Sequence, residues 1–149
     1  MTCKVPERIV DLIQAEGIDT IFGIPDPSFF AMFIHAEEQG MRVIAPRHEQ
    51  GGALMIDGMY RVTGKPGVML VTSGPGATNA VTPLQDALMD SIPVVCITGQ
   101  VATSLIGSDA FQECDTVGIT RPCTKHNWLV TDVNDLARVL HEAFRVATT

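Results

Sequence analysis

The carboxyl group of Glu49 stands out because of its place in the sequence. It lies in Arg47-His48-Glu49-Gln50-Gly51-Gly52, between a short apolar segment and an apolar helical pattern. Burial favours the neutral form of a carboxyl group and a helix N-terminus favours the charged form, so such a group could share a proton with a ligand. The alternative is that Glu49 only stabilises the start of the helix.

A glycine turn between a strand pattern and a helix pattern is the second candidate. It reads Thr72-Ser73-Gly74-Pro75-Gly76-Ala77-Thr78-Asn79, and glycines at such a turn let a ligand approach the backbone. The segment half-matches the dinucleotide fingerprint, but Asn79 stands where the third glycine belongs and Pro75 removes an N–H. A nucleotide-binding regulatory domain is therefore disfavoured.

The third candidate is the aperiodic segment Ser108-Asp109-Ala110-Phe111-Gln112-Glu113-Cys114-Asp115. An aromatic and an amide side chain among acidic residues are typical of a binding loop. The alternative, a solvated acidic surface loop, would show the same sequence pattern. The histidines and cysteines show no metal-ligand spacing and no C-x-x-C pair, so no metal site is predicted within this chain. The cysteines are expected to be small buried side chains or free thiols.

Alternating strand and helix patterns must position these residues. Helical periodicity covers residues 6–16, 29–39, 48–63, 77–89 and 133–147, with Ser28 and Asp132 as expected N-caps. Strand patterns cover residues 20–24, 42–45, 67–72, 93–98 and about 125–130. Several strands are apolar on both faces, which predicts an α/β fold with an open, doubly wound, mostly parallel sheet and helices on both faces.

The carboxyl ends of parallel strands share one edge of a sheet, where loops meet helix N-termini. Four loops are expected at that edge, at residues 23–28, 46–51, 72–79 and 99–114. The three candidate segments all fall within these loops. A ligand site at that edge is the resulting prediction.

The composition limits the class of protein. The chain has 149 residues, a length typical of one domain. Its formal charge of −7 excludes a nucleic-acid partner, and no apolar run suits a membrane span or signal peptide. A cytoplasmic or soluble organelle location is expected. Because 46% of residues are hydrophobic and only 18% charged, we expect an apolar interface besides the core.

Several motifs, in this order and spacing, resemble the large subunit of acetolactate synthase, a thiamine diphosphate enzyme, and they cover most of residues 46–128. They are His48-Glu49-Gln50-Gly51, Thr63-Gly64-Lys65-Pro66-Gly67-Val68, the Thr72–Asn79 turn, Met89-Asp90-Ser91-Ile92-Pro93-Val94, Thr98-Gly99-Gln100-Val101 and residues 109–125. The resemblance implies the thiamine diphosphate-binding fold of the pyrimidine-domain type. Residues 1–149 would form one such domain, without the middle and diphosphate-binding domains, and would be inactive alone.

The resemblance also implies roles for the candidate residues. Glu49 would bond the N1′ nitrogen of the cofactor's aminopyrimidine ring, which helps the ring remove the thiazolium proton and start 2-keto acid decarboxylation and carboligation. The residues implied to flank the pyrimidine are Pro25, Thr72, Pro75 and Asn79. Phe111 and Gln112 would face the substrate side, in the site of a partner.

By the same resemblance, the cofactor thiamine diphosphate would be shared with a diphosphate-binding domain that supplies Mg²⁺, and FAD could be bound only by the complete enzyme. The partner would be a second copy in a homodimer or a separate diphosphate-binding subunit. The complete enzyme would serve branched-chain amino acid biosynthesis. The end at Thr149 would then reflect an excised domain, a truncated product or a split subunit.

One departure from the family pattern keeps alternatives open. Ile24-Pro25-Asp26-Pro27 stands where relatives carry a Gly-Gly pair. Asp26 would then be a second acid, as in 2-keto acid decarboxylases, or a simple turn residue between two prolines. The other alternative is a noncatalytic dimerisation or interaction module that keeps the fold without the cofactor.

Overall fold

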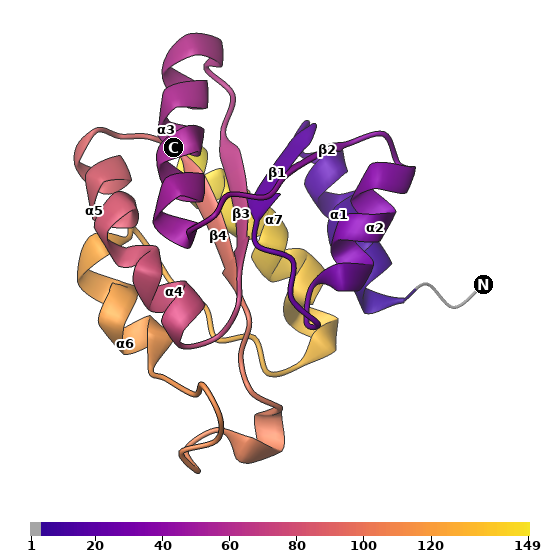
Figure 1. Cartoon of the computed structure of the whole chain (residues 1–149), viewed down its shortest axis with the longest axis vertical. Coiled ribbons are helices and arrows are strands. Elements are labelled where there is room, and N and C mark those ends of the chain that lie inside the picture. Colours follow the sequence, from indigo (N-terminus) through magenta and orange to yellow (C-terminus); the bar gives the residue numbers. More distant parts are fainter. Residues whose placement is uncertain (1–3) are drawn as a thin grey trace.

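The computed structural model describes residues 4–149, so Cys3 lies outside it. Four parallel strands form one sheet in the order β2-β1-β3-β4. They are β1 (Thr20–Gly23), β2 (Arg42–Ile44), β3 (Gly67–Val71) and β4 (Val94–Thr98). Helices cover both faces of this sheet (Figure 1), which confirms the predicted open, doubly wound α/β fold.

One face of the sheet is covered by α1 (Val5–Ala15), α2 (Phe30–Glu38) and α7 (Leu136–Thr148). Side chains of alternate strand residues point to this face, because successive residues of a strand face opposite sides. The core on this face contains Ile21, Val68, Leu70 and Val95 from the strands and Val10, Ile13, Phe33, Leu140 and Phe144 from the helices. The apolar stripes predicted for residues 6–16 and 133–147 thus bury against the sheet.

The opposite face is covered by α3 (Glu49–Thr63), α4 (Pro75–Asn79) and α5 (Val81–Met89). The intervening strand residues supply this second core. Its members include Phe22, Met69 and Val71 from the strands and Ala53, Ile56, Ala77 and Leu84 from the helices. Every residue of β3 is buried, as expected for a parallel strand between two helical layers.

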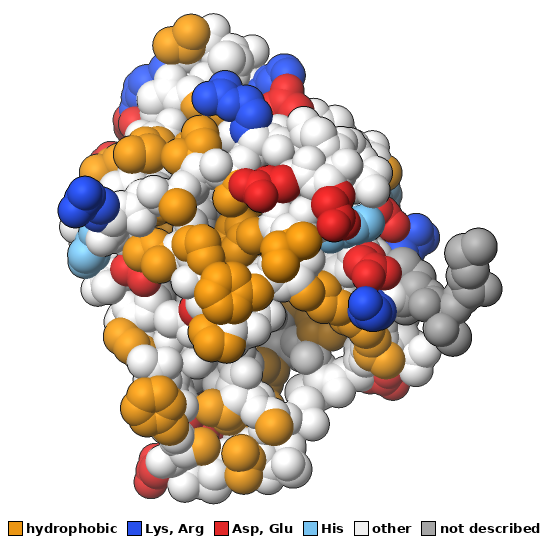
Figure 2. Space-filling model, turned by 45° about the vertical axis from the view of Figure 1, so that its right-hand side comes forward, with side chains coloured by type: hydrophobic (Ala, Val, Ile, Leu, Met, Phe, Trp, Pro, Cys, Tyr) orange, Lys and Arg blue, Asp and Glu red, His pale blue; other side chains and the backbone are white. Residues whose placement is uncertain are grey.

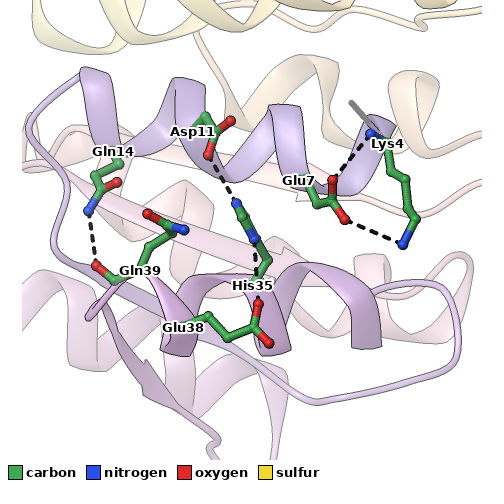
Figure 3. A network of polar contacts seen from close by, with 7 residues as sticks. All are labelled: Lys4, Glu7, Asp11, Gln14, His35, Glu38 and Gln39. Carbon is green, nitrogen blue, oxygen red and sulfur yellow. Dashed lines mark hydrogen bonds and ion pairs between the residues drawn. The ribbon is translucent and has the colours of Figure 1, made fainter. Parts of the chain in front are cut away.

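Polar side chains join α1 to α2 at the surface (Figure 3). His35 lies between two carboxylates, with its Nε2 3.0 Å from Asp11 Oδ1 and its Nδ1 3.8 Å from Glu38 Oε2. Gln14 donates a hydrogen bond of 3.3 Å from its Nε2 to the carbonyl of Gln39. The contact of His35 with Asp11 therefore links α2 to α1.

The start of α2 differs from the prediction. The helix begins at Phe30 with Phe29 as its N-cap, so the expected Ser28 cap is wrong. Instead, the Asp26 carboxylate accepts a hydrogen bond of 2.7 Å from the Ser28 N–H. An Asx turn of this kind satisfies the backbone before the helix starts, which leaves the serine hydroxyl without a capping role.

The helix expected over residues 77–89 is divided in two. α4 begins at Pro75, where the fixed φ of proline suits a first helical turn, and α5 follows after Ala80. Pro83 explains the break, because it has no N–H to donate to the carbonyl of Asn79 and its ring would crowd that carbonyl.

The strand predicted near residues 125–130 is wrong. This segment has no ladder partner and runs between two short 3-10 turns, η2 (Arg121–Cys123) and η3 (Val133–Asp135). Asp132 caps η3 and not the final helix as predicted: its carboxylate accepts a hydrogen bond of 2.8 Å from the Asn134 N–H, whereas the N-cap of α7 is Asp135. The remaining elements are η1 (Thr103–Leu105) and α6 (Thr116–Thr120).

The three cysteines that the structure describes behave as the sequence predicted. Cys96, Cys114 and Cys123 are free thiols. Cys96 packs against the core on the α3 face, and burial raises the pKa of its thiol to about 12. Burial also raises the pKa of the Cys123 thiol, so both side chains act as small apolar groups.

Large hydrophobic side chains also remain at the surface. Figure 2 shows such side chains gathered across the middle of one face, between scattered charged groups. Those exposed on the helices include Phe30, Ile34, Leu54, Met55, Val62 and Met89. The predicted apolar interface therefore has side chains that could form it.

Within residues 4–149, no helix is long and apolar enough to cross a membrane.

Candidate functional site

The carboxyl ends of the four parallel strands lie at one edge of the sheet (Figure 1). The loop after β1 contains Asp26, the loop after β2 leads to Glu49, and the loop after β3 contains Thr72. These three segments come from neighbouring strands, since β1 lies between β2 and β3. The edge is therefore where the predicted site residues can meet.

Glu49 is the first residue of α3 and its side chain is half-buried. The N-cap is His48, whose Nδ1 accepts a hydrogen bond of 3.2 Å from the Gln50 N–H. Because His48 caps the helix, the carboxylate of Glu49 is left to reach another element. Its Oε2 accepts a hydrogen bond of 3.0 Å from Asn79 Nδ2, a residue 30 positions further along the chain.

Gly76 allows α4 to approach this carboxylate closely. A Cβ at Gly76 would lie 2.7 Å from Thr72 Cγ2 and 3.5 Å from Glu49 Oε1, too near the threonine methyl for a side chain. Glu49, Thr72, Gly76 and Asn79 therefore form one cluster, here called the Glu49 cluster. Among the described residues, none donates a hydrogen bond to Glu49 Oε1, which leaves one carboxylate oxygen available to a ligand.

The role of Gly76 was not assigned from the sequence. The glycines of the Thr72–Asn79 turn were predicted to admit a ligand to the backbone. At Gly76 the missing side chain instead makes room for Thr72 and Glu49. The signal was present, because a glycine inside a helix start costs stability unless close contact requires it.

The segment that contains Phe111 and Gln112 reaches the same edge through its backbone. A Cβ at Gly74 would overlap the carbonyl oxygen of Gln112, so these two residues pack tightly. The Gln112 side chain is exposed, and Phe111 is 87% exposed. The fold thus brings Gln112 beside the glycine turn, whereas the Phe111 ring points to solvent and would be free to meet a partner.

Glu113 holds the shape of this loop. Its carboxylate accepts hydrogen bonds from the backbone N–H groups of Gly107 and Ala110, the latter at 3.0 Å. These bonds from the backbone lower the pKa of Glu113 from its usual value of 4.5. The charged form is therefore the one that organises residues 107–113, beside the Glu49 cluster.

The order of this loop should depend on pH in acid solution. Since the folded pKa of Glu113 is lowered, its contribution is complete above the ordinary value of 4.5 and is lost as the pH falls through the lowered value. NMR titration of the Gly107 and Ala110 amides should show a shared transition with a midpoint below 4.5. In Glu113→Gln that transition should vanish, and its persistence would contradict this account.

Pro25 and Asp26 lie in the turn after β1. Pro25 is exposed, and the Asp26 carbonyl accepts hydrogen bonds of 3.0 Å from the N–H groups of both Phe29 and Phe30. The Asp26 side chain also accepts from Ser28, so its turn role is established, although its Oδ2 is buried without a hydrogen-bond partner among the described residues. Among the described residues, no hydrogen bond joins this turn to the Glu49 cluster.

Pro75 is exposed at the first position of α4, next to the Glu49 cluster in sequence. The cluster thus presents a proline ring, a threonine methyl, a carboxylate and an amide at the end of a parallel sheet. Such a set can bind a flat heterocycle, with the carboxylate oxygen accepting a hydrogen bond from a ring nitrogen. Within residues 4–149, no group of three His, Cys, Asp or Glu is arranged to hold a metal ion.

A doubly wound parallel sheet with a carboxylate held at its carboxyl edge defines an α/β ligand-binding domain. Comparison with known families is consistent with this class of domain and identifies one family within it. Residues 3–119 match the family described as thiamine pyrophosphate enzyme, N-terminal TPP binding domain, where TPP is the same compound as thiamine diphosphate. The chain belongs to this family.

The chain is also similar to acetolactate synthases from several organisms. It is 52% identical to the mitochondrial catalytic subunit of Aspergillus candidus over 93% of its length and 48% identical to the chloroplastic enzyme of Arabidopsis thaliana over 98%. The isozyme 2 large subunit of Escherichia coli K12 is 48% identical over 93% of the chain. The resemblance stated from the motifs is thus confirmed.

The chain spans only part of these relatives. It covers 20% of the Aspergillus protein, 22% of the Arabidopsis protein and 25% of the Escherichia coli protein. Most of each relative therefore has no counterpart among the residues described above.

Proposed function

We propose that this chain is the pyrimidine-binding part of an acetolactate synthase-like enzyme and that Glu49 is its cofactor-activating residue. The observation that carries the proposal is the Glu49 cluster, in which Asn79 fixes one carboxylate oxygen and the other has no described partner. The family match and the similarity to acetolactate synthases support thiamine diphosphate as the ligand. When bound, this cofactor stabilises the carbanion formed as a 2-keto acid loses carbon dioxide.

The residues present suit the aminopyrimidine part of that cofactor. A flat ring with hydrogen-bonding nitrogens needs apolar surfaces on its faces and a few oriented polar groups at its edge. Pro25, Thr72 and Pro75 would supply the surfaces, and Asn79 would orient the carboxylate. Glu49 would hold a proton at the ring nitrogen, a role that a cation or a shorter acidic side chain could not fill.

Residues 1–149 would form a single domain that needs a partner for the rest of the site. Since no metal cluster is found within residues 4–149, Mg²⁺ would bind with the diphosphate in another domain or subunit. A homodimer through exposed apolar helix surfaces would bring Phe111 and Gln112 to the substrate side of the neighbouring site. FAD would belong to the complete enzyme only, and a cytoplasmic location stays a prediction.

We favour the synthase over the 2-keto acid decarboxylase, because the relatives reported above are named acetolactate synthases. The decarboxylase alternative depends on Asp26 as a second acid. The hydrogen bond that Asp26 Oδ1 accepts from the Ser28 N–H supports a turn role for this side chain, although its Oδ2 is buried without a partner among the described residues.

Titration of thiamine diphosphate with Mg²⁺ tests the proposal. Calorimetry should show weak or no binding to the chain alone and clear binding once a diphosphate-binding domain from an acetolactate synthase is added. Glu49→Gln should weaken that binding, whereas Glu37→Gln, an exposed residue on α2, should not. The chain alone should form no acetolactate from pyruvate.

Three results would favour other functions. A complex that assembles but binds no cofactor would indicate the noncatalytic interaction module. Tight binding of NAD or FAD by the chain alone would indicate the nucleotide-binding domain. Acetolactate formation by the chain alone would contradict the need for a second domain.

A further inference from the structure

The loop after β4 is long and projects from the body of the domain. It spans residues 101–113, between β4 and α6, and contains the 3-10 turn η1. Figure 1 shows this loop extending away from the sheet, beyond the carboxyl ends of the strands. Residues 102–109 are all exposed. Because the hydrophobic core supports so little of the loop, its shape depends largely on contacts within it.

The side chain of Gln100 joins the two ends of the loop. Its oxygen accepts a hydrogen bond of 2.8 Å from the Val101 N–H, and its Nε2 donates one of 3.4 Å to the carbonyl of Cys114. The loop therefore starts and ends close to one point, as compact Ω-loops do. This closure fixes the two ends but not the path of the residues between them.

Glu113 fixes that path. Its two carboxylate oxygens accept hydrogen bonds from different residues, Oε1 from the Gly107 N–H and Oε2 from the Ala110 N–H. The N–H groups of Ser108 and Asp109 also lower the pKa of this carboxyl group, so four successive backbone donors act on one anion. Hydrogen bonds to a charged acceptor are stronger than those between neutral groups.

The conformation that Glu113 holds is costly for the loop by itself. Gly107, Asp109 and Gln112 have positive φ angles of 86°, 56° and 60°. Asp109 and Gln112 are not glycine, and such residues adopt the left-handed region only at a cost in free energy. The bonds to the carboxylate offset this cost. Without them, we expect the loop to relax to other conformations.

The side chains implied to face the substrate lie next to Glu113 in the sequence. Gln112 directly precedes it, and the Gln112 carbonyl packs against Gly74 of the glycine turn. The Phe111 ring, 87% exposed, comes one residue earlier. The backbone of both residues lies between the contact at Gly74 and the bonds of Glu113 to the loop. The Glu113 carboxylate thus determines where both side chains point.

We propose that Glu113 is a positioning residue, which holds its loop so that Phe111 and Gln112 are already placed to enter the active site of a neighbouring copy. The inference rests on the function proposed above, in which these two residues face the substrate side of that site. Only the competent fraction of the loops can help to bind substrate, so an ordered loop raises the apparent affinity. Glu113 would raise that fraction without touching the 2-keto acid.

Replacement of Glu113 by Gln in the complete enzyme tests this role. The amide has one acceptor oxygen, and its NH₂ group would face a backbone donor, so the loop should open. The KM for pyruvate should rise by about tenfold or more as the competent fraction falls, while kcat stays within about twofold. Exchange of the cofactor's C2 proton, which reports on Glu49, should be unchanged. Hydrogen exchange of residues 107–113, followed by mass spectrometry, should be faster.

Gly107→Ala disturbs the same loop by another route. The φ of 86° is strained for alanine, and a Cβ there would meet nothing within 4 Å, so only the backbone conformation is opposed. The KM should rise as in Glu113→Gln although the carboxylate is intact. This variant also provides the measurement if Glu113→Gln does not assemble. Glu37→Gln, the same chemical change on α2, should alter neither KM nor exchange.

Three results would overturn the proposal. Unchanged exchange of residues 107–113 in Glu113→Gln would mean that the carboxylate does not hold the loop. Faster exchange with an unchanged KM would mean that the order of the loop does not affect substrate binding. A loss confined to kcat and to C2 proton exchange would mean that Glu113 acts on cofactor activation. Failure of the proposed function would differ from all three, because Glu49→Gln would then leave C2 proton exchange unchanged.

Discussion

Replacement of Glu49 by Gln in the complete enzyme that contains this chain is expected to lower turnover by about 100-fold or more, the usual contribution of a positioned acid or base. The amide keeps the size of the side chain and can still contact Asn79, but it cannot share a proton with a ring nitrogen. Steady-state kinetics with pyruvate should show the loss mainly in kcat. Exchange of the cofactor's C2 proton, followed by NMR, should slow in parallel.

Two controls distinguish a loss of cofactor activation from a loss of folding or assembly of the enzyme. Glu37→Gln, which makes the same chemical change at an exposed position of α2, should leave turnover unchanged. Circular dichroism and the unfolding midpoint of Glu49→Gln should match those of the parent, because the carboxylate accepts one hydrogen bond from the side chains of the described residues, that of Asn79. Turnover within a few-fold of the parent would refute the assigned role of Glu49.

Substitutions at the contact of Gly67 with Ile56 should have the largest effect on stability. Ile56 is fully buried, and a Cβ at Gly67 would lie 2.9 Å from its Cγ1 and 3.0 Å from its Cβ. Gly67→Ala should destabilise by about 1–3 kcal/mol through overpacking. Ile56→Ala should destabilise by about 2–5 kcal/mol through the lost burial and the cavity left behind.

The double variant decides whether these two residues act through one contact. In Gly67→Ala/Ile56→Ala the new methyl would occupy part of the space vacated by isoleucine, so the combined loss should be smaller than the sum by about 0.5–3 kcal/mol. Urea unfolding measures all three values. Simple additivity would contradict the packing described for this contact.

Gly58 provides the matched control for this series. It lies in the same helix as Ile56, and a Cβ there would meet nothing within 4 Å. Gly58→Ala should therefore stabilise by about 0.5–1 kcal/mol, because alanine has less backbone freedom to lose than glycine in a helix. A large loss of stability at Gly58 would show that the helix cannot accept any added methyl.

The layers of the fold could be read from the sequence because hydrophobic periodicity is a local property. The residues of β3 are apolar without interruption, and only a strand covered on both faces buries them all. The helical stripes followed for the same reason. The strand prediction at residues 125–130 was wrong because a local pattern does not supply a neighbouring strand. The prediction of Ser28 as N-cap was wrong because the Asp26 carboxylate accepts a hydrogen bond from the Ser28 N–H in a turn before the helix.

The kinds of side chain at the candidate site were also determined by the sequence. It places a carboxylate, an amide and small residues in loops after successive strands. Their arrangement was decided by the tertiary structure. Glu49 and Asn79 are 30 residues apart, and they meet because β2 and β3 flank β1 and Gly76 has no side chain. Contacts between residues so far apart in the sequence depend on how the helices pack on the sheet. A local pattern of residues does not predict that packing.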